Sequence, residues 1–211
     1  MNEYLALKHM ESIPPNEIDK PDVYYIPHHA VFNRNKIRVV FNASMPSQNC
    51  LSLNSVLSSG RKLQQDIVLV LNRCRCYKVV FVCDIVKIFR QILVDARGRD
   101  WLRILSDFGK GLQQFRLCTV TYGTACAPYQ ALRILWEILK RICPNSANML
   151  LLFLRLSYID DFFGGADTWE QALEIHYELI ETLKAAKMEL GKLSVNRKEL
   201  LSGITNIDQN D

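Results

Sequence analysis

A two-residue alternation of apolar and polar positions marks the predicted strands. Over residues 24–41 this alternation is interrupted by an asparagine-rich turn, which predicts a β-hairpin. Runs of β-branched and aromatic residues at 77–85 and 151–157 predict two buried strands, the second leading into a hairpin at Tyr158–Asp161. Three further short strands are expected, at residues 89–94, 101–106 and 115–120.

Apolar positions spaced three or four apart predict the helices. Residues 66–75 and 123–141 show this spacing, and Thr168 is placed to cap a last helix. A short amphipathic helix is expected within residues 2–12, before Pro14 and Pro15. Because strands and helices are mixed along the chain without an internal repeat, the sequence predicts an α+β fold.

Composition indicates a globular protein and excludes several classes. Of the 211 residues, 49% are hydrophobic and 23% are charged, which excludes disordered, collagenous and fibrous chains. The longest wholly apolar stretch, residues 149–154, is far shorter than the ~20 residues of a spanning helix, so no membrane partner is expected. Seven cysteines, an odd number, and the absence of an export signal favour an intracellular protein, either cytoplasmic or nuclear. The net charge of +4 permits a polyanionic partner.

Three carboxylates stand in otherwise apolar surroundings. Asp84 ends the first buried run, and Asp160 and Asp161 follow the second. Two divalent cations would compensate such charges, and oxygen ligands of this kind suit in-line phosphoryl or nucleotidyl transfer. Adjacent strand residues point to opposite faces, so Asp160 and Asp161 reach one site only if the backbone turns there. The alternative is a solvated Asp-Asp turn with no chemical role.

Four stretches of the sequence resemble the reverse transcriptases of the Pao/BEL group of LTR retrotransposons. They are residues 25–32, 38–44, 119–128 and 158–161, and the resemblance extends over nearly the whole chain. The first and third are specific to the group, whereas the Tyr-x-Asp-Asp box at 158–161 marks reverse transcriptases generally. The resemblance implies an RNA-directed DNA polymerase, in which two metal ions support nucleotide transfer from a dNTP to a primer 3′-hydroxyl on a nucleic-acid template.

The resemblance also implies roles for single residues. The metal ligands and catalytic acids would be Asp84, Asp160 and Asp161, holding two Mg²⁺ ions, with Mn²⁺ as the alternative metal. The nucleotide-binding residues would be Arg38, Phe89, Tyr122, Gly123 and Lys192, with Tyr158 and Pro128 on the primer and template side. Phe89 would act as the aromatic gate that excludes a 2′-hydroxyl. The alternatives are a core aromatic for Phe89, a solvated strand edge for Arg38 and a solvated side chain for Lys192.

The domain organisation implied by the resemblance is that of fingers and palm, without a thumb. Residues 1–21 would be a leader segment, and the fingers would be residues 22–59 and 93–126. The palm, with a ferredoxin-like βαββαβ core, would be residues 60–92 and 127–211.

The expected partners follow from this organisation. They are an RNA or DNA template-primer, a dNTP and the rest of a Pol polyprotein, namely thumb, RNase H and integrase. Fingers and palm alone are expected to grip nucleic acid weakly. Two rival hypotheses are a catalytically silent retrotransposon remnant that at most binds nucleic acid, and an α+β interaction domain whose acids are turn residues.

Overall fold

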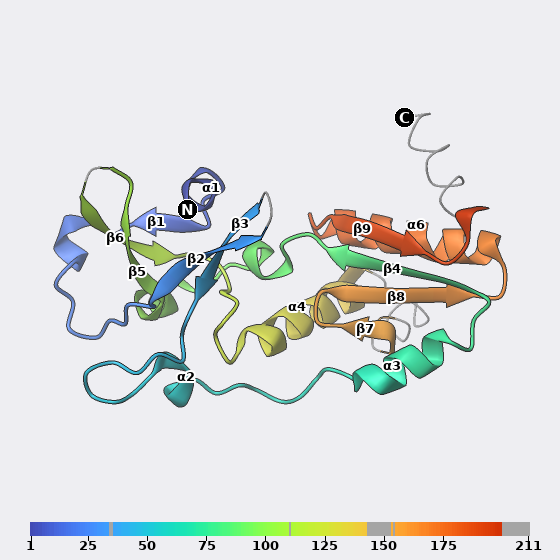
Figure 1. Ribbon diagram of the computed structural model, residues 1–211, viewed down its shortest axis with the longest axis horizontal. Coiled ribbons are helices and arrows are strands. Elements are labelled where there is room, and N and C mark those ends of the chain that lie inside the picture. The colour runs from blue at the N-terminus through green and yellow to red at the C-terminus, as the bar shows by residue number, and fades with distance from the viewer. Residues whose placement is uncertain (34–35, 110, 143–152, 154, 200–211) are drawn as a thin grey trace. The chain divides into compact units, whose positions relative to one another are not determined.

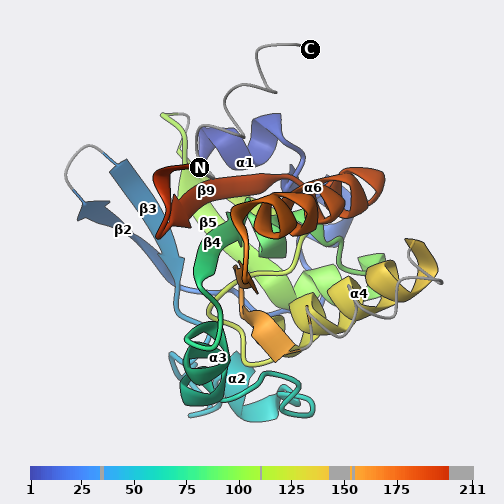
Figure 2. The ribbon, with the colours of Figure 1, turned by 90° about the vertical axis from the view of Figure 1, so that its right-hand side faces the viewer.

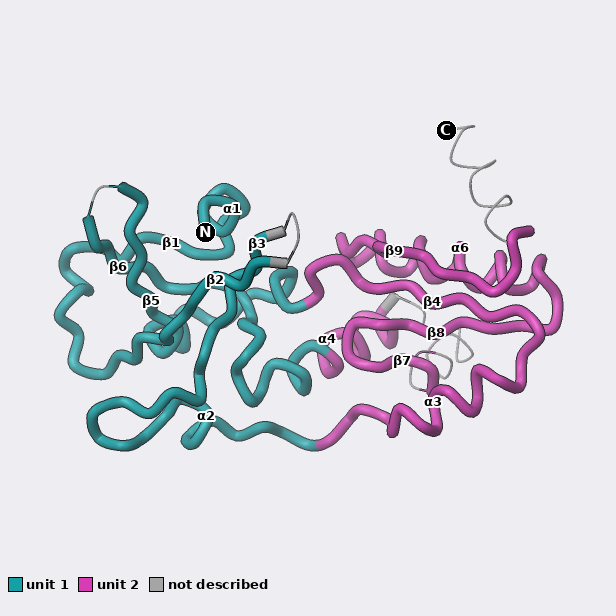
Figure 3. Tube along the Cα trace, in the orientation of Figure 1, with its two compact units in different colours: residues 1–61, 89–131 teal, residues 62–88, 132–211 magenta. Residues whose placement is uncertain are grey.

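The chain folds into two compact units, each assembled from two separate stretches of sequence. The computed structural model describes residues 1–33, 36–109, 111–142, 153 and 155–199 (Figure 1). Unit 1 is formed by residues 1–61 and 89–131, and unit 2 by residues 62–88 and 132–211 (Figure 3). Both units combine helices with antiparallel strands, which confirms the predicted α+β class. None of the helices in the described ranges is long and apolar enough to cross a membrane.

Unit 1 contains a three-stranded sheet and a separate hairpin. The sheet has the order β1-β6-β5, formed by Met10–Ser12, Leu112–Leu117 and Arg103–Asp107. The predicted hairpin is confirmed as β2 (His28–Asn33) and β3 (Lys36–Phe41). The short helices of this unit are α1 (Asn2–Ala6), η1 (Pro15–Glu17), α2 (Leu53–Val56) and η3 (Ala96–Leu102).

Residues 1–21, expected as a leader segment, are part of unit 1. The helix expected within residues 2–12 covers only α1, because Lys8 adopts a positive φ of 56° and the chain continues as β1. Met10, 2% exposed, pairs with Leu117 of β6 and lies in the core of the unit. The N-terminal stretch is therefore structural.

Unit 2 is built on a four-stranded antiparallel sheet with the order β7-β8-β4-β9. Its strands are Ser157–Tyr158, Asp161–Ala166, Val79–Ile85 and Leu190–Val195. Helix α6 (Trp169–Ala185) packs against β4 and β8, and Figure 2 shows it beside β4. Helix α3 (Ile67–Cys74) packs against β7 and β8. Helix α4 (Ala127–Ile142) begins in unit 1 and continues in unit 2.

Helix α6 begins at the cap that the sequence predicts, and Asp66, expected as the first residue of a helix, is the N-cap of α3. Thr168 Oγ1 accepts the Gln171 N–H at 3.3 Å, and Asp66 Oδ1 accepts the Val68 N–H at 2.8 Å. Along α6 the buried positions recur at helical spacing, at Ala172, His176, Leu179 and Leu183. The apolar spacing thus predicts correctly the burial of His176, Leu179 and Leu183, whereas Trp169, which shares that spacing, is 39% exposed.

Two predicted strands are wrong. Residues 88–91 form a 3-10 turn, η2 (Ile88–Gln91), because Lys87 has a positive φ of 52° and ends the extended run that contains β4. Of the strand expected at 151–157, Phe153 and residues 155–156 are helical and only Ser157 joins β7, while residues 151, 152 and 154 lie outside the described residues. Phe153 and Leu156 are nevertheless buried, and a short apolar run does not distinguish a buried strand from a buried helix.

Three other predicted elements are shifted along the chain. The strands expected at 101–106 and 115–120 correspond to β5 and β6, whose bounds differ by a few residues. The helix expected at 123–141 begins only at Ala127, because Gly123 has a φ of 96° and belongs to the preceding turn.

A buried ion network supports unit 1. The side chain of Arg103 is fully buried, and its guanidinium donates to Asp100 Oδ1 at 2.9 and 3.0 Å. It also donates to the backbone oxygens of Glu17 at 2.6 Å and Ile18 at 2.9 Å. Arg103 thereby joins two stretches of chain that are distant in sequence, residues 17–18 and 100–103.

Gly164 of β8 should not tolerate a side chain. It lies opposite Phe81 of β4, and an added Cβ would stand 2.0 Å from Cζ of that ring. We expect Gly164→Ala to lower the free energy of unfolding by about 1–3 kcal/mol, measured by urea denaturation. The control is Gly98→Ala, whose Cβ would lie 3.4 Å from Val94, an ordinary contact. Equal stability of the two variants would contradict this prediction.

Candidate functional site

The candidate metal site lies where β4 meets the β7–β8 hairpin. In the antiparallel pairing of β4 with β8, Asp84 lies directly opposite Asp161. Directly opposed residues share one face of the sheet, with Cβ atoms about 4.5–5.5 Å apart. Tyr158 pairs with Asp161, so Ile159 and Asp160 form a two-residue turn between the strands. The backbone therefore turns at Asp160, as it must if the side chains of Asp160 and Asp161 are to reach one site.

Backbone contacts fix this turn against β4. The Ile85 N–H donates to the Asp160 backbone oxygen at 2.9 Å, directly after Asp84 in the chain. Ile159 has a φ of 56°, whereas Asp160 does not have a positive φ. This is the pattern of a type II′ turn, in which glycine is the usual residue at the first position. A β-branched residue with positive φ is strained, and such strain is common at functional sites.

The electrostatics of the site show an excess of negative charge. Asp84 Oδ1 is buried and has no hydrogen-bond partner within the described residues. Burial, together with the charges of Asp160 and Asp84, raises the pKa of Asp161. Burial, with Asp84 and Asp161 nearby, raises the pKa of the Cys83 thiol to about 12. The ionised form of Asp161 is thus disfavoured at this place.

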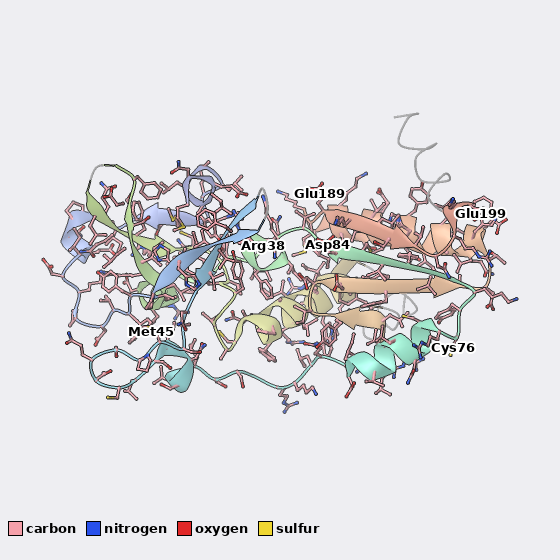
Figure 4. The ribbon with its side chains drawn as sticks, viewed as in Figure 1. Arg38, Met45, Cys76, Asp84, Glu189 and Glu199 are labelled. Atoms are coloured by element: carbon pink, nitrogen blue, oxygen red, sulfur yellow. The ribbon has the colours of Figure 1, made fainter. Side chains whose placement is uncertain are left out.

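Gly191 of β9 lies against the Asp84 carboxylate, and the sequence analysis missed it. A Cβ added at Gly191 would stand 2.7 Å from Asp84 Oδ1. The glycine therefore lets the β9 backbone approach the carboxylate closely (Asp84 is labelled on β4 in Figure 4). Nothing in the sequence around Gly191 indicates this approach, because it depends on the pairing of β4 with β9.

These residues fit hard cations such as Mg²⁺. Magnesium binds carboxylate oxygens, and a buried carboxylate oxygen without a hydrogen-bond donor is a suitable ligand. As the side chains stand, however, no three His, Cys, Asp or Glu residues of the described ranges are grouped closely enough to enclose a metal ion. The fit therefore rests on the opposed strands, the turn and the buried oxygen of Asp84.

The remaining predicted residues divide between the two units. Lys192 lies on β9 in unit 2 with an exposed side chain, and Tyr158 is half-buried on β7. The others belong to unit 1: Arg38 on β3, Phe89 on η2, Tyr122 and Gly123 in the turn before α4, and Pro128 in the first turn of α4.

Within unit 1, several of the predicted nucleotide-binding residues are close together. The rings of Phe89 and Tyr122 meet edge to face, with centroids 6.3 Å apart. The Tyr122 hydroxyl donates to the Val39 backbone oxygen at 3.2 Å, next to Arg38, whose side chain is exposed. The structure therefore connects the Tyr122 turn directly to strand β3.

Asn54 holds the Tyr122–Gly123 turn, and the sequence analysis missed it too. Its Nδ2 donates to the Gly123 oxygen at 2.8 Å, and its Oδ1 accepts the Ala125 N–H at 2.7 Å. Gly123 itself has a φ of 96°, and a Cβ there would lie 2.3 Å from the Phe41 oxygen. Only glycine fits this position, because the absence of a Cβ allows both the positive φ and the close approach to Phe41.

No protein-family model matches this chain, and no curated protein matches it at a significant level. The chemistry of the site therefore rests on the residues described above. Opposed carboxylates with a strained turn are suited to binding divalent cations, and the Phe89 and Tyr122 rings are suited to packing against a sugar or a base.

Proposed function

We propose that the chain carries the nucleotidyl-transfer site of an RNA-directed DNA polymerase of the Pao/BEL type. In this proposal unit 2 is the palm and unit 1 the fingers. The observation that supports it most directly is the opposition of Asp84 and Asp161 across β4 and β8, beside Asp160 in the turn. The buried and unpartnered Oδ1 of Asp84 adds a reason for a cation at this place.

The topology of unit 2 is compatible with a polymerase palm. Strand β4, which carries Asp84, is an inner strand of the β7-β8-β4-β9 sheet, and the other two acids come from the neighbouring hairpin. Helices α3 and α6 pack against the strands of this sheet. The acids are thus mounted on regular, packed elements rather than on a long loop.

The proposal assigns metal binding to the three acids and triphosphate binding to two basic residues. Asp84, Asp160 and Asp161 would hold two Mg²⁺ ions, acting as ligands rather than as general acids. When bound, such ions activate a primer 3′-hydroxyl and stabilise the leaving pyrophosphate. The guanidinium of Arg38 suits a triphosphate because its fork donates parallel hydrogen bonds, and Lys192 adds a point charge.

Selection of the sugar would fall to the aromatic pair of unit 1. Phe89, braced by the Tyr122 ring, would pack under the deoxyribose and clash with a 2′-hydroxyl. The Tyr122–Gly123 turn and Pro128 would line the nucleotide and template side.

Primer extension on a poly-rA/oligo-dT duplex tests the proposal. We expect the wild-type chain to incorporate dTTP with Mg²⁺ or Mn²⁺ and to stop when the metal is chelated. Asp160→Asn should lower the rate by more than about a hundredfold, because it removes a metal ligand. Asp167→Asn, beyond the far end of β8, is the matched control and should extend normally. If the wild type and Asp160→Asn extended the primer at the same rate, the proposed polymerase activity would be refuted.

A second candidate function is a catalytically silent module that only binds nucleic acid. This module would need no metal site, and the net charge of +4 permits a polyanionic partner. This module would bind the same duplex with equal affinity in the wild type and Asp160→Asn, and neither protein would extend the primer. The binding and extension arms of the experiment therefore separate the two functions.

A further inference from the structure

The N-terminal helix α1 brings a buried tyrosine to the turn that carries Tyr122. Tyr4 is 6% exposed and belongs to the hydrophobic core of unit 1. Its hydroxyl lies 2.8 Å from the Tyr122 hydroxyl, although the two residues are 118 positions apart in the sequence. The contact is therefore a tertiary one, made only in the folded unit.

The hydrogen-bond pattern determines which hydroxyl donates. A phenol carries one hydrogen, and that of Tyr122 is directed to the Val39 backbone oxygen at 3.2 Å. The hydrogen between the two hydroxyls must then come from Tyr4. Burial and the hydrogen bond with Tyr122 raise the pKa of Tyr4, which keeps this hydrogen in place. Within the described part of the chain, the Tyr4 hydroxyl therefore donates the hydrogen bond that the Tyr122 hydroxyl oxygen accepts.

Tyr4 is also connected to Phe89, through the next residue. The guanidinium of Arg90 lies 4.2 Å from the centre of the Tyr4 ring, and Arg90 Nε donates to His9 Nδ1 at 2.9 Å. Phe89 directly precedes Arg90, and its ring meets the Tyr122 ring. Tyr4, Tyr122, Phe89 and Arg90 therefore form a closed cycle of contacts.

We propose that Tyr4 is a positioning residue for the nucleotide site. It holds Tyr122 through its hydroxyl and Phe89 through Arg90, and so fixes the two rings against which the sugar of an incoming dNTP rests. Tyr4 itself touches no substrate. The inference rests on the proposed function, since it assigns Phe89 and Tyr122 to nucleotide binding.

Kinetics of Tyr4→Phe test this role, because the variant keeps the ring and the Arg90 contact and loses only the donor. We expect the KM for dTTP on poly-rA/oligo-dT to rise about twofold to tenfold while kcat changes less than about twofold. The preference for dTTP over UTP should fall by a similar factor. A residue that only supports folding would not separate KM from kcat in this way.

The matched control is Tyr24→Phe, which removes another tyrosine hydrogen bond of unit 1, to the Met45 oxygen at 2.8 Å. It should leave the KM and the dTTP preference unchanged. A double-mutant cycle of Tyr4→Phe and Tyr122→Phe in urea unfolding provides a readout without activity, and we expect the two effects to be non-additive.

The outcomes distinguish this inference from the proposed function. A wild-type chain that extends primers while Tyr4→Phe leaves the KM and the dTTP preference unchanged would overturn the role of Tyr4 alone, and so would additive effects in the cycle. A wild-type chain that does not extend primers would overturn the proposed function and, with it, the nucleotide role of Tyr4. The coupling between the two hydroxyls would then still be seen in the cycle.

Discussion

Replacing Asp84 by asparagine should make the metal-free protein more stable and remove both the expected response to Mg²⁺ and the proposed polymerase activity. Asparagine keeps the size of the side chain and removes a charge that faces Asp161 across the strands. Like charges directly opposite one another are destabilising, so the melting temperature without metal should rise by up to about 2–4 °C. Primer extension should fall by more than about a hundredfold, because a buried ligand is lost.

The pH dependence of this stabilisation has a definite sign. Because the pKa of Asp161 is raised by burial, by Asp160 and by Asp84, the folded state retains its proton to a higher pH than the unfolded state does. The favourable contribution of the protonated acid is complete below the unfolded pKa and is lost as the pH rises through the folded pKa. Asp84→Asn should therefore stabilise the protein at neutral pH and have little effect in acid.

Thermal melts with and without Mg²⁺ measure these effects. A ligand at a hundred times its Kd stabilises the folded state by about 2.7 kcal/mol, so the wild-type shift should be easily seen. Asp167→Asn, the control outside the site, should melt like the wild type in both conditions. If Asp84→Asn retained the full Mg²⁺ shift, the ion would not bind at Asp84, and the two-metal proposal would fail.

The second large effect is expected in unit 1, where Arg103→Met should lower the free energy of unfolding by about 3–5 kcal/mol. Methionine matches the aliphatic part of the arginine but removes the fully buried guanidinium from Asp100, which keeps only Lys20 at 3.0 Å and Arg116 at 3.5 Å. It also leaves the backbone oxygens of Glu17 and Ile18 without their donor. Arg103→Lys should recover only part of this loss, because an ammonium does not reproduce the forked geometry.

Urea denaturation of three variants provides the comparison. The matched control is Arg97→Met in η3, the 3-10 helix that directly precedes Arg103. Arg97 pairs with Asp95, and both side chains are largely exposed, 91% and 62%. Exposed pairs contribute about 0–1 kcal/mol, so the control should unfold close to the wild type. Similar losses for Arg97→Met and Arg103→Met would mean that burial of Arg103 contributes nothing.

Local patterns in the sequence predict much of this fold. The hairpin at 28–41, strand β4 and the caps of α3 and α6 are predictable because each depends on residues close together in the chain. The strand expected at 89–94 is wrong because one left-handed residue, Lys87, redirects the backbone, and no periodicity indicates it. The local pattern does not predict the burial of Arg103 either, since two of its acceptors, the backbone oxygens of Glu17 and Ile18, lie on a distant segment.

For the candidate site, the sequence predicts which acids take part but not how they are arranged. Carboxylates that follow apolar runs indicate Asp84, Asp160 and Asp161, but their opposition depends on the register between β4 and β8. The roles of Gly191, Asn54 and Tyr4 depend on contacts between residues far apart in sequence, such as the pair of tyrosine hydroxyls. Such contacts are properties of the packed structure and leave no local pattern.

The isoleucine at the first position of the II′ turn has a consequence for the precision of the acids beside it. Glycine at position 159 would give the hairpin several backbone wells of similar energy, whereas a β-branched residue has only a narrow well at positive φ. The two paired strands hold Ile159 in that well. The hairpin is thus less stable than it could be but stiffer, so the carboxylates beside it sample fewer orientations.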